Sequence, residues 1–338
     1  MLNRIIRILA TTLGALLIAA GCSKAPYGPA SEQEHPISFD AGPALMLNDA
    51  MATRTSPLPA NTHFGVFAFL QPNNGTWNTN RTPDYMFNVD VRYDGSTYFY
   101  SPIRFWPSTS NKVSFWAYSP YDSNTSSFYS YNSGTGVFSQ YTSGSKNIPN
   151  VRFTMTDGQT DFLVSDIEKN QTSATNGGTV ALKFNHALSL IDFTVEKDDE
   201  HDDYEVYLTD ISLVDIYFSG ICKTDRSWAG HSGGRHTLSV LSGGSQEATG
   251  TRTAVSGASV MVIPQTVVNT DAMLRVVYTL ELRGSNNPKT NECLLPITNN
   301  WASNGHYTYY LQITPDLPIE FTVSWSDWGV HYNYHLGS

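Results

Sequence analysis

Charged residues, cysteines and long apolar runs are scarce in this sequence, and each scarcity excludes a class of protein. The 20 lysine and arginine residues are outnumbered by 30 acidic residues and form no basic stripe, which argues against nucleic-acid binding. The three cysteines form no CxxC pattern, so no metal site is expected. No nucleophile motif such as GxSxG accompanies His186, and beyond the first residues no apolar run is long enough to cross a bilayer. We therefore predict that the protein is not an enzyme and needs no cofactor.

The first residues have the layout of a secretory signal. Arg4 and Arg7 give a basic start, residues 8–20 are apolar and uncharged, and the string LIAAGC leads through small residues into Cys22. This ending resembles a bacterial lipobox, so we predict a lipoprotein signal peptide over 1–21 and acyl chains such as palmitate on Cys22. Each buried methylene contributes about 0.8 kcal/mol, so two or more chains anchor a protein to a membrane. An ordinary signal peptide followed by a chance cysteine is the alternative.

The composition favours an all-β fold. The chain contains 19 tyrosines, 16 phenylalanines and 7 tryptophans, and clusters of Gly, Asn, Ser and Pro recur at short intervals, as expected for many short strands. Residues 113–118 alternate with a period of two, and Asp94-Gly95 is a strong hairpin signal. The polar stretch 122–144 could be a long surface loop or an inserted hairpin. Only NHALSL, residues 185–190, could form a helical turn.

Two polar stretches suggest the domain organisation. The proline-containing residues 22–35 are predicted to be a tether between the lipid and the fold. Residues 170–178 contain no apolar residue larger than alanine and are rich in turn formers, so a domain boundary is predicted there. The predicted units are an N-terminal antiparallel β-sandwich over 36–172 and a C-terminal one over 177–338.

Side chains that could carry chemistry are scattered. Cys222 and Cys293 could form a disulfide if their Cα atoms lie within about 7 Å of each other. His186 has no nucleophile motif beside it and is expected to be structural. His231 and His236 lack a further ligand, and the acidic run Asp198, Asp199, Glu200, Asp202 and Asp203 lacks the glycine and spacing of a calcium loop. A solvated loop and a solvated hairpin tip are expected instead.

Short motifs follow one another in a characteristic order along the chain. They are the lipobox, TR at Thr53-Arg54, FGVFAF (64–69), FWP (105–107), VSFWAYSPY (113–121), DFLVSD (161–166), VALKFNHALSLIDF (180–193), VIPQ (262–265) and WASNGHYTYYL (301–311). This order resembles the fimbrillin family of type V pilus subunits, the Mfa-like fimbrillin lipoproteins. The resemblance covers nearly the whole mature chain.

The resemblance implies two transthyretin-like β-sandwich domains in tandem and a fimbrial subunit displayed on the outer membrane or cell surface, serving adhesion. Family subunits assemble by donor-strand exchange, in which cleavage at an arginine removes the lipidated leader with its first strand and a neighbour's strand fills the groove. Arg54 matches that arginine, which would make Thr55 the new first residue. The implied partners are other fimbrial subunits, in a homo- or hetero-polymer, and a host or bacterial surface glycan or protein.

The C-terminal sequence offers a candidate donor strand, because apolar and polar residues alternate there. Its apolar members are Val330, Tyr332, Tyr334 and Leu336. The same residues could instead be the last strand of their own sandwich, as in a tip, anchor or accessory subunit.

The alternative function is that of a monomeric outer-membrane glycan-binding lipoprotein. Its sugar platform would draw on Trp77, Trp106, Trp116, Trp301, Trp325 and Trp328. Exposed, coplanar tryptophans would favour this alternative, whereas buried ones favour the pilin.

Overall fold

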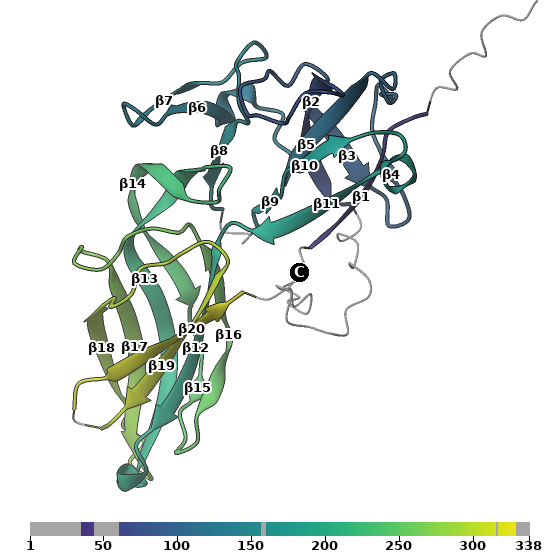
Figure 1. Ribbon diagram of the computed structural model, residues 1–338. Helices are drawn as coiled ribbons and strands as arrows, with labels where there is room; N and C mark the ends of the chain where they lie inside the picture. The colour runs from purple at the N-terminus through teal and green to yellow at the C-terminus, as the bar shows by residue number, and fades with distance from the viewer. Residues whose placement is uncertain (1–34, 44–60, 157–159, 316, 329–338) are drawn as a thin grey trace, which may run out of the picture. The chain divides into compact units, whose positions relative to one another are not determined.

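The computed structural model describes residues 35–43, 61–156, 160–315 and 317–328 (Figure 1). In these ranges the chain forms β-strands joined by turns, with three short 3₁₀ segments, and the predicted all-β fold is confirmed. The segment NHALSL contributes to strands and a turn and forms no helix. None of the helical segments found among these residues is long and apolar enough to cross a membrane.

One sheet is built from the first half of the described chain. Its strand order is β1-β11-β9-β5-β2-β3-β4, with β10 paired to β5. The bounds are β1 (Ser38–Pro43), β2 (His63–Pro72), β3 (Met86–Tyr93), β4 (Tyr98–Phe99), β5 (Asn111–Ser119), β9 (Leu163–Ser165), β10 (Glu168–Gln171) and β11 (Thr179–His186). The predicted hairpin at Asp94-Gly95 is confirmed, because Tyr93 pairs with Tyr98 across it.

The central strands of this sheet are buried on both faces. In β5, Val113, Phe115 and Ala117 enter one apolar core, whereas Trp116 and Tyr118 enter another on the opposite face. Aromatic and β-branched side chains at successive positions suit a strand covered on both sides. The first of these cores also contains Phe39 and Ala41 of β1.

Two further sheets contain the rest of the described chain. An eight-stranded sheet consists of β6 (Phe128–Asn132), β7 (Val137–Gln140), β8 (Asn150–Thr154), β13 (Tyr204–Cys222), β14 (Trp228–Leu241), β15 (Gln246–Glu247), β17 (Met273–Leu282) and β18 (Lys289–Pro296). A four-stranded sheet consists of β12 (Ser189–Lys197), β16 (Thr253–Val262), β19 (Gly305–Ile313) and β20 (Glu320–Asp327). Leu190 and Tyr309 of the smaller sheet share a core with Leu213 and Leu274 of the larger one, as in a sandwich.

The predicted boundary falls on a connection between two strands of the first sheet. Residues 170–178, the predicted boundary, join β10 to β11, and both strands belong to the first sheet. The last strand of that sheet ends at His186. The polar stretch 122–144 contains the hairpin β6–β7, and this hairpin belongs to the sheet of β13. The division into two tandem domains stays a prediction.

Candidate functional site

The candidate site surrounds β1, the short strand at the start of the described chain. We call it the β1 channel: β11 lies along one edge of β1, the segment 98–106 lies along the other, and Phe64 and Phe115 pack against its buried face. Its sequence alternates, so that Ile37, Phe39 and Ala41 are buried while Ser38 and Asp40 are exposed. Burying an isoleucine or phenylalanine side chain stabilises a fold by about 1.5–3 kcal/mol. Although β1 has only six residues, it therefore supplies a substantial part of the core around it.

One edge of β1 pairs with a strand far away in sequence. β1 runs parallel to β11, in a register that extends from Ser38 opposite Thr179 to Pro43 opposite Phe184 (Figure 1). Strand β11 alternates as well, and its Val180, Leu182 and Phe184 enter the same core as Phe39. A parallel pair requires a long crossover connection, which explains why no local sequence pattern joins these two strands.

The other edge of β1 is held by the segment 98–106. The Ile37 N–H donates to the Arg104 carbonyl at 2.8 Å, and the Tyr100 hydroxyl donates to the Ile37 carbonyl at 2.9 Å. Further along, the Tyr98 hydroxyl donates to the Ala41 carbonyl at 2.6 Å. Burial raises the pKa of Tyr100, which keeps its hydroxyl a proton donor. β1 is thus hydrogen-bonded on both sides.

Aromatic rings surround the middle of β1. The Phe39 ring makes edge-to-face contacts with Phe64, Tyr100 and Phe115, with centroid separations of 6.2, 5.5 and 6.0 Å. Such pairs contribute about 0.5–1.5 kcal/mol beyond the burial of area. The Trp106 indole closes the start of the channel by donating to the Gly178 carbonyl at 2.9 Å.

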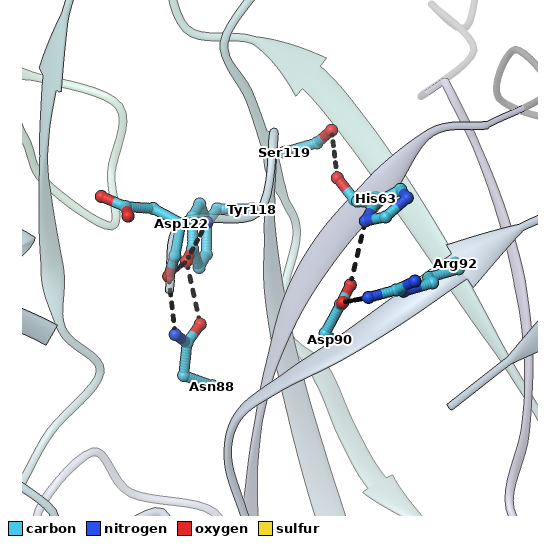
Figure 2. Close-up of polar contacts among 7 residues, drawn as sticks. All are labelled: His63, Asn88, Asp90, Arg92, Tyr118, Ser119 and Asp122. Carbon is cyan, nitrogen blue, oxygen red and sulfur yellow. Dashed lines mark hydrogen bonds and ion pairs between the residues drawn. The ribbon is translucent and has the colours of Figure 1, made fainter. Parts of the chain in front are cut away.

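On the opposite face of the sheet, a buried polar cluster fixes β2, β3 and β5 against one another (Figure 2). The Tyr118 hydroxyl donates to Asn88 Oδ1 at 2.8 Å, and Asn88 Nδ2 donates to the Asp122 carbonyl at 2.8 Å. Asn88 has a φ of 49°, in the left-handed region that asparagine tolerates, at a register shift between β2 and β3. A Cβ on Gly65 would lie 2.4 Å from the Tyr118 ring, so only glycine fits there.

A second group in Figure 2 brings together a serine, a histidine and an aspartate, but not as a catalytic triad. Ser119 Oγ donates to the backbone carbonyl of His63 at 3.1 Å and not to its ring. Asp90 is 3.4 Å from the His63 ring and 2.8 Å from Arg92. With no nucleophile bonded to the imidazole, the group is a set of surface ion pairs.

The predicted processing, lipid and donor residues cannot be placed. Cys22, Arg54, Thr55 and the candidate donor strand Val330, Tyr332, Tyr334 and Leu336 all lie outside the described residues. The described strand β1 precedes Arg54 in the chain and lies within the predicted leader. The residues that hold β1, namely Tyr98, Tyr100 and the strand β11, were not predicted from the sequence. The aromatic pattern around Tyr98 was visible, but its partner strand was not.

The disulfide considered for Cys222 and Cys293 is not formed, because both thiols are free. Cys293 in β18 lies opposite Val276, which lies opposite Ile211 in β13, whereas Cys222 ends β13. Eleven residues of strand from Ile211 to Cys222, at about 3.3 Å each, place the two cysteines far beyond disulfide distance. Burial also raises the pKa of the Cys222 thiol.

The isolated histidines have structural partners. His186 lies 2.7 Å from Asp161 and stacks on Trp328 with ring centroids 3.9 Å apart. His231 and His236 contact the carbonyls of Pro264 and Gly233, at 3.0 and 2.9 Å. The expectation that this pair lies in a loop is wrong, because both belong to the irregular strand β14. Repeated register shifts in its pairing with β13 accommodate the glycines.

The acidic run forms a short connection between two different sheets instead of the expected hairpin tip. It joins β12 to β13, and the Asp198 side chain accepts a hydrogen bond from the Glu200 N–H at 3.0 Å. Asp202 is 3.7 Å from the Lys197 amine. Among the described residues, no group of three histidine, cysteine or acidic side chains could hold a metal ion.

The six candidate tryptophans do not form a platform. Trp106, Trp116, Trp301 and Trp328 are buried, and Trp77 packs against Phe69. Trp325, on the edge strand β20, is the one member of this set with most of its surface exposed, at 59%. The placement therefore favours the pilin interpretation over a sugar-stacking face.

The fold defines the class of the protein: an all-β protein of several sheets, with a short strand held among aromatic side chains. In a comparison of structures, the chain superposes on a fimbrial protein from Bacteroides vulgatus ATCC 8482 with a TM-score of 0.67. The two are 22% identical, over 87% of this chain and 99% of that one. A protein from Bacteroides ovatus ATCC 8483, assigned provisionally to cell adhesion, gives a TM-score of 0.52 at 16% identity, over 88% and 99% of the chains.

Comparison of sequences identifies the family. The fimbrillin-like family matches residues 52–328, most of the chain, and the protein belongs to this family. The fimbrium subunit Fim1C of Phocaeicola vulgatus is 29% identical over 228 residues, which are 62% of this chain. The match spans 58% of the length of that relative.

Proposed function

We propose that the protein is a subunit of a cell-surface fimbria in which β1 is removed and replaced by a strand from a neighbouring subunit. Membership of the fimbrillin-like family supports a fimbrial role. The observation that carries the proposal is the construction of β1, which fills an aromatic channel and is bonded on both edges, yet precedes Arg54 in the chain. A single cut at Arg54 would separate this strand covalently from the strands that hold it.

Without β1 the emptied channel would be unstable. Loss of β1 would expose the apolar side of β11 and the ring of Phe115 to water, and would leave the backbone groups of β11 without partners on one edge. An unpaired strand edge beside an apolar groove is a strong acceptor for an incoming strand. Backbone hydrogen bonds would supply affinity, and alternate side chains in the Ile37, Phe39 and Ala41 positions would set the register.

The proposed sequence of events uses the residues predicted from the sequence. Acyl chains on Cys22 hold the precursor at the outer membrane, and cleavage after Arg54 releases the leader and leaves Thr55 as the first residue. Val330, Tyr332, Tyr334 and Leu336 of another subunit then enter the channel. The resulting fimbria serves adhesion to a host or bacterial surface glycan or protein.

Controlled cleavage of the purified precursor tests this proposal. Treatment with a trypsin-type protease is expected to give a subunit that starts at Thr55 and forms detergent-resistant ladders on a gel, because the emptied channel takes up a strand. The Arg54→Ala variant is the matched control and should remain monomeric under the same treatment. Cleavage that leaves a stable monomer, or an Arg54→Ala form that polymerises as well as the parent, would contradict the proposal.

A further inference from the structure

We propose that the folded bodies of two successive copies of this chain also contact each other, and that the exposed end of β20 on one copy docks against the loop 99–105 of the next. This inference rests on the proposed strand exchange and adds a specific surface to it. It follows from the position of an apolar loop, the position of an exposed tryptophan and the short separation along the sequence between that tryptophan and Val330.

The acceptor surface is a loop with three large exposed apolar side chains. Phe99, Ile103 and Phe105 are 48%, 49% and 38% exposed within seven residues of chain. Exposed apolar side chains grouped in this way are typical of interaction surfaces. The loop lies at the start of β1, because Pro36 forms a bridge with Phe105. Any chain that enters the channel in the direction of β1 therefore passes this loop first.

The donor surface lies at the end of β20. Trp325 lies against Gly305, where a Cβ would be 3.0 Å from the indole nitrogen, and most of its ring is exposed. Asp327, two residues further on, is also exposed. Within the described part of the chain, β20 is an edge strand that pairs with β19 alone. An edge strand with an exposed indole is suited to contact another protein.

The spacing along the chain brings these two surfaces together. Trp328, the last described residue, is buried and stacks on His186, and its backbone N–H donates to the Asn304 carbonyl at 2.6 Å. Val330, the first residue of the candidate donor strand, follows only two residues later, a reach of about 7 Å. If the donor runs in the direction of β1, parallel to β11, its own body must abut the entrance beside Phe105.

The charges on the two surfaces are complementary. Arg104 lies in the acceptor loop with its side chain exposed, and Asp327 ends the donor strand. Neither forms an ion pair with another described residue. Opposite charges at the rim of an interface steer association and fix orientation.

Engineered cysteines test which end of the channel receives the donor body. In a Cys293→Ser background, Ser101→Cys protein is mixed with Ser326→Cys protein, processed with protease and oxidised. A covalent dimer is expected, since both serines flank the proposed contact. The matched control replaces Ser101→Cys by Lys183→Cys, which lies at the far end of β1 opposite Gly42, and no dimer is expected from it.

The outcomes separate this inference from the proposed function. The docking surface would be overturned, and strand exchange left intact, if ladders form but cysteines at positions 101 and 326 do not crosslink. The same holds if ladders form and Lys183→Cys crosslinks instead. Absence of ladders after cleavage of the parent would overturn both.

Exchanging the charges at positions 104 and 327 provides an independent test, in which the rate of ladder formation is measured on chains without new cysteines. Arg104→Glu and Asp327→Arg are each expected to slow ladder formation by about threefold to tenfold at low salt, because like charges then meet at the rim. The double variant should recover most of the parental rate. Lys289→Glu on β18 makes the same change in net charge as Arg104→Glu, away from the proposed contact, and should leave the rate within about twofold. Single variants that assemble at the parental rate would overturn the proposed contact.

Discussion

Tyr118 illustrates how single residues fix the sheet beneath the β1 channel. Its hydroxyl joins Asn88 of β3 to the chain beyond β5, and its ring occupies the space left by the missing side chain of Gly65 in β2. These three residues depend on one another, because a Cβ at position 65 would collide with both of the others. The sequence alone showed Gly65 only as part of a good strand, since the bulge at Asn88 that brings the residues together is set by tertiary pairing.

Burial of Tyr118 predicts a loss of stability at high pH. Burial raises the pKa of Tyr118 well above its usual value of about 10, so the folded state keeps the proton while the unfolded state loses it. The stability is therefore intact below pH 10 and falls as the pH rises above it, by up to roughly 1.4 kcal/mol per pH unit for this residue. The free energy of unfolding, measured by urea titration between pH 8 and pH 11.5, should decline less steeply in Tyr118→Phe than in the parent. Equal slopes would contradict this assignment.

At the scale of the element, β1 should contribute to stability far beyond its length. Phe39→Ala is expected to lower the free energy of unfolding of the precursor by about 3–5 kcal/mol, because it leaves a cavity among Phe64, Tyr100 and Phe115. Asp40→Ala is the matched control on the same strand, and with its side chain exposed it should change the value by about 0.5 kcal/mol or less. Urea unfolding of both variants provides the measurement.

The same pair of variants distinguishes a removable strand from a permanent one. If the leader is cleaved away, Phe39 is absent from the assembled fimbria, and ladders made from Phe39→Ala precursor should resist detergent as well as parental ladders do. If Phe39→Ala and Asp40→Ala lower the free energy of unfolding of the precursor equally, then β1 contributes less to stability than its contacts indicate. Ladders weakened by Phe39→Ala would indicate that β1 stays in the polymer.

Some of the strands could be predicted from the sequence and others could not. Strand β5 follows the period-two alternation of residues 113–118, and the sequence predicted it. The partners of β1 were not predictable, because a parallel pair between residues about 140 apart leaves no local signal. The irregular strand β14 was missed since its Gly-Gly pair is typical of a turn, and only pairing with β13 keeps it extended.

At the scale of the whole molecule, the two halves of the chain contribute strands to one sheet and side chains to one core. Strand β8 of the first half pairs with β13 of the second, with Ser219 opposite Thr154. Phe67 and Trp116 of the first sheet belong to the same continuous core as Phe193 and Tyr309. A composition break in the sequence, such as the polar residues 170–178, therefore marks an exposed turn and does not by itself mark where the packing changes.

Limited proteolysis within residues 170–178 tests this view of the molecule. Ala174, Asn176 and Gly177 are exposed, so a protease should cut there and yield two fragments on a denaturing gel. The cut leaves β11 on the C-terminal fragment, although β11 is bonded to β1 and β9 of the N-terminal one. The fragments are therefore expected to elute together from a sizing column under native conditions and to separate only in denaturant. Two fragments that elute separately without denaturant would show that each half is an independent domain and that β11 contributes little to holding the first sheet together.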